Sequence, residues 1–440
     1  MTNRQPNILF IFPDQHRPDW LGCNKDLPLR TPNLDRLAKR GVQFTNAFTP
    51  SPLCSPARAC LATGRDYHRC GVKNNGQNTP RSLPTYFQSL RDAGYRVCGV
   101  GKFDLHKADH DQGLDGQNMI TEYGFTEGID NEGKWDAVRS YKKGDNRPSG
   151  PYMHYLQRRG LDLVHAKAMV EGSTKHHKAW VTPLPDDAYC DNWVAENAMR
   201  FLRDFPADRP WHLVVNFTGP HEPFDVTADM HEAWKDTELP PANDNDSDDP
   251  DVVLARRRHY AATIENIDRH MGRMINLVEQ RAELDNTLIV YSSDHGEMLG
   301  DHGRWGKSAW YTPSSGVPLI VYGPGIRQNT RSDALVSLHD LAATFLDYAG
   351  ASELPESDTC SLRGVLEGQC EKHRDYVLSG LNDWSMVFDG RYKYVIRTEL
   401  SPLLYDIQED PQELINIAQT QPHFASKLAG ILKSGTGKPE

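Results

Sequence analysis

The chain has 440 residues, 38% of them hydrophobic and 25% charged, which is typical of a folded globular protein with one large domain and an appendage, or with two to three domains. Its formal net charge of −11 argues against nucleic acid or an anionic membrane surface as a partner. The eight cysteines form no C-x-x-C pair, so the sequence predicts neither a disulfide scaffold nor a cysteine zinc site.

No apolar run is long enough to cross a bilayer, and the run from Ile8 to Phe12 is too short for a signal peptide. We therefore expect a cytoplasmic protein without a membrane partner. The sequence leaves the oligomeric state open, with a homo-oligomer as one possibility.

In chain order, short apolar runs alternate with segments of helical pattern. The first run, from Asn7 to Phe12, is a predicted buried strand that ends at Pro13-Asp14. Further strands are predicted over residues 95–100, 211–217, 286–292 and 317–322, and helices over residues 31–39, 82–93, 191–205, 258–284 and 337–349. This alternation indicates an α/β fold with a mostly parallel sheet covered by helices on both faces.

Two segments interrupt the alternation. Residues 105–188 are rich in charge, glycine and aromatic side chains and show little periodicity, so we expect loops that frame a pocket. Residues 242–251 read ANDNDSDDPD and lack the glycine and the final glutamate of a calcium-binding EF-hand loop. We interpret this second segment as a solvated acidic linker.

The pattern changes after residue 355. Short strands are predicted over residues 376–378, 385–388 and 391–397, with an edge at 403–406 and a last helix over 423–432. Asp389-Gly390 is a strong hairpin-turn signal between two of these strands. We therefore divide the chain into a large α/β domain, residues 1–355, and a C-terminal subdomain, residues 356–440, with a small antiparallel sheet and a helix.

Polar side chains follow four of the predicted strands, at the ends where ligands bind in parallel sheets. They are Asp14 and Gln15 after the first strand, Lys102 after the second, His221 after the third, and Asp294 and His295 after the fourth. Carboxylate and amide oxygens together with an imidazole suit one divalent cation, and calcium, magnesium and manganese all remain open.

The segment SPLCSPARACLATGR, residues 51–65, places a cysteine between two prolines. Pro56 is suited to the first turn of a helix, so Cys54 is predicted to lie just before a helix N-terminus, where backbone N–H groups favour an anion. The local pattern permits two interpretations of Cys54: a small buried hydrophobic residue or an activated nucleophile.

Motifs of one known family follow one another through nearly the whole chain. They are Asn7-Ile8-Leu9 before Asp14, Cys54-x-Pro56-x-Arg58 with Leu61-x-Thr63-Gly64, Gly94-Tyr95 through Gly101-Lys102, Gly219-Pro220-His221, Asp294-His295-Gly296-Glu297, Gly306-Lys307 and Leu404-Tyr405-Asp406. The chain thereby resembles the formylglycine-dependent (type I) sulfatase family of the alkaline phosphatase superfamily, and the Cys54 motif is similar to its maturation signature. The Asp-Gln and Asp-His pairs are similar to those of choline sulfatases and phosphonate monoester hydrolases.

The resemblance implies an alkaline phosphatase-like fold with a four-stranded C-terminal sheet. It also implies hydrolysis of a sulfate monoester of a small molecule or saccharide by the residue-1–355 domain. In that family a formylglycine-generating maturation enzyme oxidises the cysteine, here Cys54, to Cα-formylglycine, whose hydrate is the nucleophile. The implied ligands of one divalent cation, calcium first and Mn²⁺ or Mg²⁺ as alternatives, are Asp14, Gln15, Cys54 as formylglycine, Asp294 and His295. The other implied site residues are Arg58, Lys102 and Lys307 for the sulfate charge, His221 for protonation of the leaving oxygen, and Asn75 for substrate contact.

The chain departs from the family where many sulfatases carry Lys-x-His, because it reads Lys102-Phe103-Asp104-Leu105-His106. In an extended segment, side chains two apart share a face, so Lys102, Asp104 and His106 are predicted to point into one pocket. On this hypothesis His106 is the base that releases sulfate, and Asp104 orients it or contacts a cationic or hydroxylated substrate. The alternative is that Asp104 is a loop carboxylate paired with Lys102. The open alternatives are a phosphonate or phosphate ester hydrolase of the same superfamily and a non-catalytic binding protein.

Overall fold

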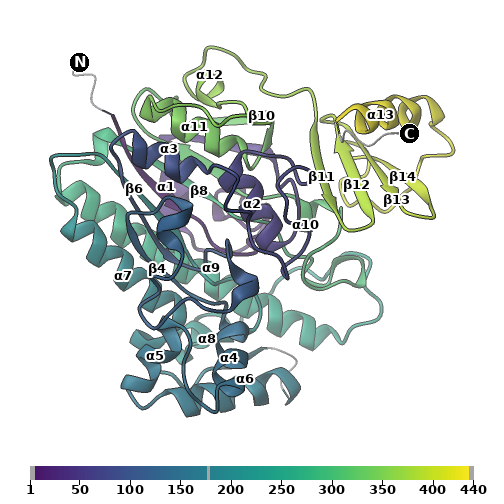
Figure 1. Cartoon of the computed structure of the whole chain (residues 1–440). Coiled ribbons are helices and arrows are strands. Elements are labelled where there is room, and N and C mark those ends of the chain that lie inside the picture. Colours follow the sequence, from purple (N-terminus) through teal and green to yellow (C-terminus); the bar gives the residue numbers. More distant parts are fainter. Residues whose placement is uncertain (1–4, 176–178, 436–440) are drawn as a thin grey trace.

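The computed structural model describes residues 5–175 and 179–435, and an eight-stranded sheet lies at its centre (Figure 1). In spatial order its strands are β10 (Thr330–Ser337), β2 (Val42–Phe48), β9 (Leu319–Tyr322), β8 (Thr287–Ser292), β1 (Asn7–Ile11), β6 (Trp211–Asn216), β3 (Arg96–Gly101) and β4 (Glu127–Asp130). Neighbouring strands are parallel except at β9, which runs antiparallel to both β2 and β8. The predicted α/β fold with a mostly parallel sheet is confirmed.

Helices cover both faces of this sheet. The helices before the C-terminal sheet are α1 (Pro32–Arg40), α2 (Cys54–Thr63), α3 (Tyr86–Asp92), α4 (Lys134–Lys143), α5 (Pro151–Arg158), α6 (Asp162–Lys175), α7 (Cys190–Asp204), α8 (Ala228–Trp234), α9 (Pro250–Gln280), α10 (Thr312–Ser315), α11 (Asp340–Ala349) and α12 (Arg363–Leu366). Ile8 and Phe10 of β1 pack in one buried cluster with α2, α3 and α11, whereas Leu9 and Ile11 pack in another with α1, α7 and α9. Both faces of β1 are thus covered, which explains its continuous apolar sequence.

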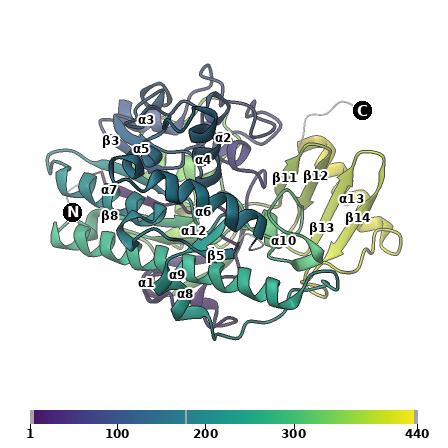
Figure 2. The ribbon, with the colours of Figure 1, turned by 90° about the horizontal axis from the view of Figure 1, so that it is seen from below.

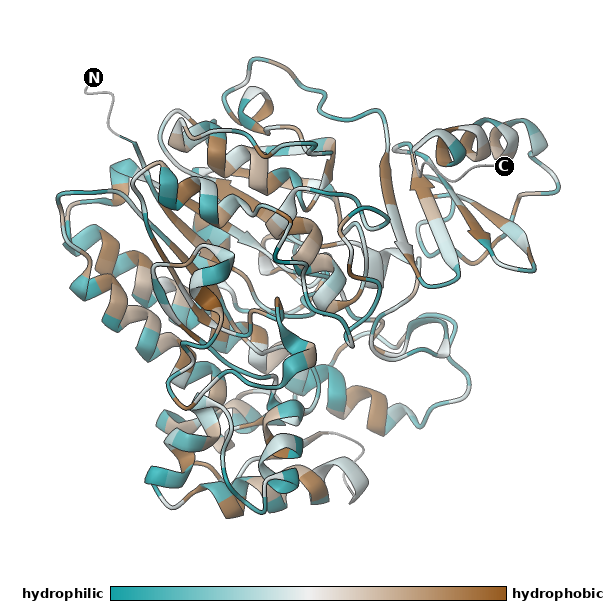
Figure 3. Ribbon diagram, viewed as in Figure 1, coloured by the Kyte–Doolittle hydropathy of each residue, from teal (hydrophilic) through white to brown (hydrophobic). Residues whose placement is uncertain are grey.

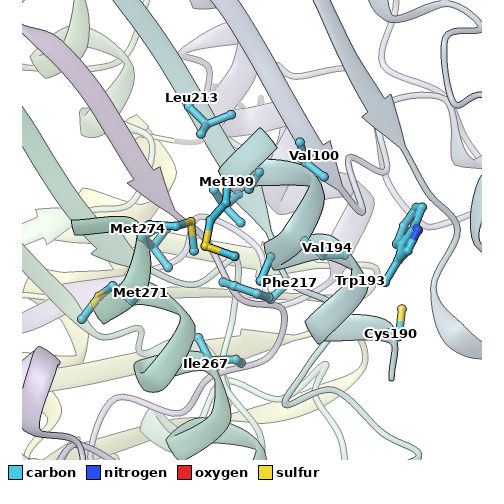
Figure 4. Packing of buried hydrophobic residues seen from close by; sticks show 14 of the residues in the cluster. Val100, Cys190, Trp193, Val194, Met199, Leu213, Phe217, Ile267, Met271 and Met274 are labelled. Carbon is cyan, nitrogen blue, oxygen red and sulfur yellow. The ribbon is translucent and has the colours of Figure 1, made fainter. Parts of the chain in front are cut away.

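Methionines fill the space between α7, α9 and the sheet (Figure 4). Met199 of α7 and Met271 and Met274 of α9 lie in the same buried cluster as Leu213 of β6 and Phe217. The flexible, unbranched methionine side chain suits such an irregular gap. Hydrophobic residues accordingly concentrate on the central strands and on the helix faces that cover them (Figure 3).

Residues 105–188 do not form the loops that the sequence predicts. The described part of this segment contains β4, the helices α4, α5 and α6, and the short strand β5 (Ala179–Val181), which pairs with β7 (Phe224–Val226). Tyr141 of α4 and Tyr152 and Leu156 of α5 belong to the same buried cluster as α7. The helices are short and separated by charged residues and glycines, so their apolar spacing is hard to see in the sequence.

Helix α9 begins at Pro250 rather than at residue 258. The Asp249 side chain accepts a hydrogen bond from the backbone N–H of Asp251 at 3.0 Å, and Pro250 takes the first helical position. The end of the acidic segment 242–251 is therefore a helix cap and not only a solvated linker. Despite the length of α9, none of the helices in the described parts of the chain is long and apolar enough to cross a membrane.

A four-stranded antiparallel sheet follows, as predicted, and consists of β11 (Val377–Leu381), β12 (Trp384–Phe388), β13 (Tyr392–Arg397) and β14 (Leu400–Asp406). Helix α13 (Pro422–Gly435) packs on one face through Leu428 and Leu432, and sheet and helix lie together beside the α/β part (Figure 2). The other face packs against Phe48 and Trp310. The Asp389-Gly390 turn joins β12 to β13, while the division of the chain at residue 355 stays a prediction.

A buried ion pair attaches this C-terminal sheet to the α/β part. Nζ of Lys393, on β13, lies 2.7 Å from Oε1 of Glu413, and both side chains are at most 1% exposed. Nζ also donates a 2.7 Å hydrogen bond to Oγ1 of Thr312, whose backbone N–H donates to Oε2 of Glu413 at 2.6 Å. Because Thr312 lies in the connection between β8 and β9, the ion pair holds that connection against the C-terminal sheet.

Lys393→Met is expected to destabilise the protein by about 3–5 kcal/mol, because it leaves the Glu413 carboxylate buried without its partner. Urea denaturation measures this loss. The matched control is Arg391→Met, which breaks an ion pair with Asp406 in which the arginine side chain is 45% exposed. The free energy of unfolding of the control should fall by less than about 1 kcal/mol. An equal fall in both variants would contradict the larger contribution expected of the buried pair.

Candidate active site

The carboxyl ends of four neighbouring strands bring the predicted polar residues together. Asp14 and Gln15 follow β1, Asp294 and His295 follow β8, Lys102 follows β3, and His221 follows β6 after a short loop. Helix α2 begins at the same place, with Cys54 as its first residue. The structure thus brings the side chains at these strand ends together at one place.

The sequence predicts Cys54 just before the helix, whereas in the structure Cys54 is the first residue of α2. Its side chain is buried, and its Sγ lies 3.3 Å from Nε2 of His295 and 3.9 Å from Oδ1 of Asp14. Burial raises the pKa of the thiol, but the charges of Lys102 and Lys307 outweigh burial and hold this pKa well below its usual value. The environment of Cys54 therefore favours an anion.

Four buried residues form a cluster with the geometry of a metal site. One donor atom each from Asp14, Cys54, Asp294 and His295 lies within 4.8 Å of the other three. Burial and the charge of Asp14 raise the pKa of Asp294, because two like charges are held close together. Two carboxylates, an imidazole and a fourth donor at residue 54 fit a divalent cation.

Arg58 joins both carboxylates from within α2. Its Nε donates to Oδ2 of Asp294 at 3.0 Å, and its Nη2 donates to Oδ2 of Asp14 at 3.1 Å. Nη1 donates to Oδ1 of Asn216 at 3.1 Å. Arg58 follows Cys54 by four residues, so both side chains lie on the same face of the helix.

Lys102 reaches the same carboxylate from the end of β3. Its Nζ lies 2.5 Å from Oδ2 of Asp14 and 3.2 Å from Oδ2 of Asp104. Gly101 permits this approach, since its φ is +105° and a Cβ there would lie 1.9 Å from the backbone oxygen of Asn216. Burial lowers the pKa of Lys102, but Asp104 and Asp14 together raise it well above its usual value.

His106 does not share a face with Lys102 and Asp104, so that prediction is wrong. The strand ends at Gly101 and Asp104 adopts a φ of +55°, so the segment is not extended. Nε2 of His106 lies 2.8 Å from Oδ2 of Asp130, and its ring stacks on Tyr123. His106 thus packs behind the segment that carries Lys102.

His221 and Lys307 face the cluster from two loops. Nε2 of His221 contacts Nζ of Lys307 and lies 4.0 Å from Oδ1 of Asp14. Nζ of Lys307 also donates to Oε1 of Gln15 at 2.5 Å. The two groups lie at the open side of the site, because the side chain of His221 is 25% exposed whereas Asp14 is fully buried.

Glu297 is a site residue to which sequence reasoning assigned no role. It is fully buried, and its Oε1 accepts hydrogen bonds from the backbone N–H groups of Leu299 at 3.0 Å and Gly306 at 2.6 Å. Its Oε2 contacts the amide nitrogen of Gln15. Glu297 thereby orients the Gln15 side chain and holds the loop before Lys307, a role that its place in the Asp294 motif hints at without specifying.

The loop after Lys307 is held by the C-terminal sheet. The backbone N–H of Ser308 donates to the oxygen of Pro52 at 3.1 Å, and the oxygen of Ser308 accepts from Nε1 of Trp384 at 3.2 Å. The Lys393–Glu413 ion pair holds the same loop at Thr312. Residues of the C-terminal sheet therefore fix a loop of the site without reaching its centre.

Asn75 lies at the wall of a cavity that opens from the site. Its Oδ1 accepts a hydrogen bond from the backbone N–H of Ser55 at 3.0 Å. Asn75, Lys102 and His221 are among the residues that line a cavity of about 420 Å³. This cavity offers space for a ligand next to Lys102 and His221.

Comparison with known proteins agrees with this geometry. A family model described as Sulfatase matches residues 6–351. The chain belongs to the sulfatase family. A second family model, described as N-sulphoglucosamine sulphohydrolase, C-terminal, matches residues 300–433.

Individual relatives agree with the family. The chain is 30% identical to a choline-sulfatase of Rhizobium meliloti, over 95% of this chain and 83% of the relative. It is 26% identical to an N-acetylglucosamine-6-O-sulfatase of Bacteroides thetaiotaomicron, over 94% of this chain and 83% of the relative. The structure superposes on a phosphonate monoester hydrolase of Agrobacterium radiobacter with a TM-score of 0.83, 25% identity and coverage of 98% of this chain and 95% of that one. This sulfatase therefore has the fold of the alkaline phosphatase superfamily.

The carboxylate cluster predicts that a divalent cation stabilises the folded chain. Adding Ca²⁺ to chelator-treated protein should raise the midpoint of thermal unfolding. When free Ca²⁺ is a hundredfold above its Kd, the free energy of unfolding should rise by about 2.7 kcal/mol. Asp294→Asn should remove most of this shift, since it takes one charge from the cluster. An equal Ca²⁺ shift in parent and variant would place the ion elsewhere and contradict the assignment.

Proposed function

We propose that this sulfatase hydrolyses a sulfate monoester with one bound divalent cation and a Cα-formylglycine nucleophile made from Cys54 by a formylglycine-generating enzyme. The observation that carries the proposal is the position of Cys54. Its Sγ lies at the first turn of α2, beside His295 and Asp14, and among the cations Arg58, Lys102 and Lys307. A buried hydrophobic cysteine would have apolar neighbours instead.

Asp14, Gln15, Asp294 and His295 are the proposed ligands, joined by an oxygen of residue 54. Hard oxygen donors favour calcium, with magnesium or manganese as alternatives. A bound cation supplies positive charge that polarises the sulfate and favours ionisation of a neighbouring hydroxyl. The hydrated aldehyde would supply one hydroxyl for attack on sulfur. Its second hydroxyl, once deprotonated, would re-form the C=O bond as the C–O bond to the sulfate breaks.

Arg58 and Lys102 are proposed to compensate the charge of the sulfate oxygens. Both are buried cations that now contact Asp14, so they are held in place before substrate arrives. Asp104 serves this step as a positioning residue, because its carboxylate helps to keep Lys102 protonated. Oδ1 of Asn75 accepts a hydrogen bond from the backbone of Ser55, so the amide N–H groups of Asn75 are proposed to donate to the substrate.

His221 and Lys307 are proposed to act on the leaving oxygen. Nζ of Lys307 and Nε2 of His221 are in contact, so Lys307 limits the directions in which the His221 ring can point. Lys307 can thereby hold His221 in the orientation needed to donate a proton to the departing alkoxide. His106 has no part in this proposal, because it packs against Asp130.

Cys54→Ala should abolish turnover and leave the thermal unfolding midpoint nearly unchanged, since it deletes only one sulfur from the site. The parent should be produced together with a formylglycine-generating enzyme. Mass analysis of the peptide that contains residue 54 should then show loss of sulfur and gain of oxygen in the parent. As a control, Cys60→Ala on the same helix should keep the modified mass at residue 54, and undiminished turnover by Cys54→Ala would refute the nucleophile.

A second candidate, phosphonate or phosphate ester hydrolysis, is favoured by the superposition on the phosphonate monoester hydrolase. We expect the chain to prefer sulfate, because the full Cys54 signature and Lys102 both match the sulfatase pattern. The test compares kcat/KM for aryl sulfate, phosphate and phosphonate esters that carry the same phenol. A higher kcat/KM for the phosphate or phosphonate ester than for the sulfate ester would favour phosphorus ester hydrolysis over sulfate hydrolysis.

A further inference from the structure

The cavity lined by Lys102 and His221 leads from the buried site to the protein surface. Lys102, which lines it, is buried, whereas Arg139, which also lines it, has a side chain that is 74% exposed. On the proposed function, His221 lies next to the oxygen that departs from sulfur. The alcohol half of the ester must then occupy this cavity, so its lining selects the substrate.

A row of alternating charges runs outwards from Asp14, and its members Lys102, Lys107, Asp136 and Arg139 line the cavity. Lys102 lies between two carboxylates, 2.5 Å from Asp14 and 3.2 Å from Asp104. Lys107 likewise lies 3.0 Å from Asp104 and 3.1 Å from Asp136. The neighbouring lysines hold the pKa of Asp136 below its usual value against the effect of burial. Asp104 and Asp136 are thus already paired with lysines.

Arg139, on α4, is the outer end of this row. Its Nη1 lies 3.6 Å from Oδ1 of Asp136, and its guanidinium lies 5.9 Å from the ring centroid of Trp135. Asp104 and Asp136 each lie between two cations. Arg139, in contrast, contacts one carboxylate, Asp136, and in the described parts of the chain no second carboxylate pairs with it. The outer side of Arg139 is therefore open to an anion.

The same wall is unsuited to a cationic substrate. A quaternary ammonium group is recognised by aromatic faces and uncompensated carboxylates. Trp135 is the aromatic residue among those that line the cavity, and Arg139 lies near its ring. Glu222, the other carboxylate of the lining besides Asp136, interacts electrostatically with Arg256. The positive charges of Arg139 and Lys107 would repel a choline head group.

We propose that the alcohol released by this sulfatase carries an acidic group, a carboxylate or a second sulfate, and that Arg139 binds it. This specificity rests on the proposed sulfate ester hydrolysis. It predicts that choline O-sulfate is a poor substrate, although the chain is 30% identical to a choline-sulfatase. Arg139 is a specificity residue, since it lies outside the cluster of reacting groups.

The first experiment compares 3-carboxyphenyl sulfate with 3-carbamoylphenyl sulfate, which have similar leaving phenols but differ by one charge. The metal-loaded, modified enzyme should show at least about a tenfold higher kcat/KM for the carboxylate, mostly through KM, and added salt should reduce the preference. Arg139→Gln should abolish the preference and leave kcat/KM for the amide unchanged. The control Lys142→Gln removes an exposed charge from the same helix outside the cavity lining and should keep the preference.

The second experiment compares choline O-sulfate with 3,3-dimethylbutyl sulfate, its uncharged carbon analogue. The parent should hydrolyse the uncharged ester with the higher kcat/KM, and Arg139→Gln should narrow the difference. A preference for choline O-sulfate, or a carboxylate preference that survives Arg139→Gln, would overturn the proposal while leaving sulfate hydrolysis intact. If none of the four sulfate esters is hydrolysed, the proposed function fails and the subsite fails with it.

Discussion

The site depends on the contact of Arg58 with Asp14 and Asp294. The two carboxylates follow β1 and β8, neighbouring parallel strands, so the backbone holds two negative charges together where both are fully buried. A buried charge without a partner costs several kcal/mol, and one guanidinium contacts both, at 3.1 and 3.0 Å. Because Arg58 is one helical turn from Cys54, the helix that supplies this compensation also places residue 54 at the centre.

The groups at the strand ends were predictable because a buried parallel strand leaves a simple trace, an apolar run followed abruptly by polar residues. The position of His106 could not be predicted from the sequence. It depends on a left-handed backbone conformation at Asp104 and on a partner, Asp130, from another strand. The strands β2 and β10, which lie next to each other at one side of the sheet, were also missed. Each carries exposed polar residues, such as Thr45 in β2 and Arg331 in β10, that hide the apolar pattern.

The reaction and its specificity come from different parts of the chain. Regular strands and α2 supply the groups around Cys54, and their motifs made the family recognisable. The cavity wall comes largely from α4 and from the segment around Lys107, within the region expected to be loops. Its outer charges, Asp104, Lys107, Asp136 and Arg139, are arranged by contacts with one another and lie outside the family motifs. The class of reaction could therefore be read from the sequence, and the alcohol could not.

The attachment of the loop after Lys307 to Trp384, Lys393 and Glu413 has a consequence for protein synthesis. Trp384 is translated about 330 residues after Cys54. At about 5–20 residues per second, a ribosome takes roughly 15–65 s to add this length. During that interval Cys54 belongs to an unfinished chain, whereas in the finished fold its side chain is 1% exposed. On the proposed function, an enzyme that modifies Cys54 would thus compete with folding, and slower translation would lengthen the time in which it can act.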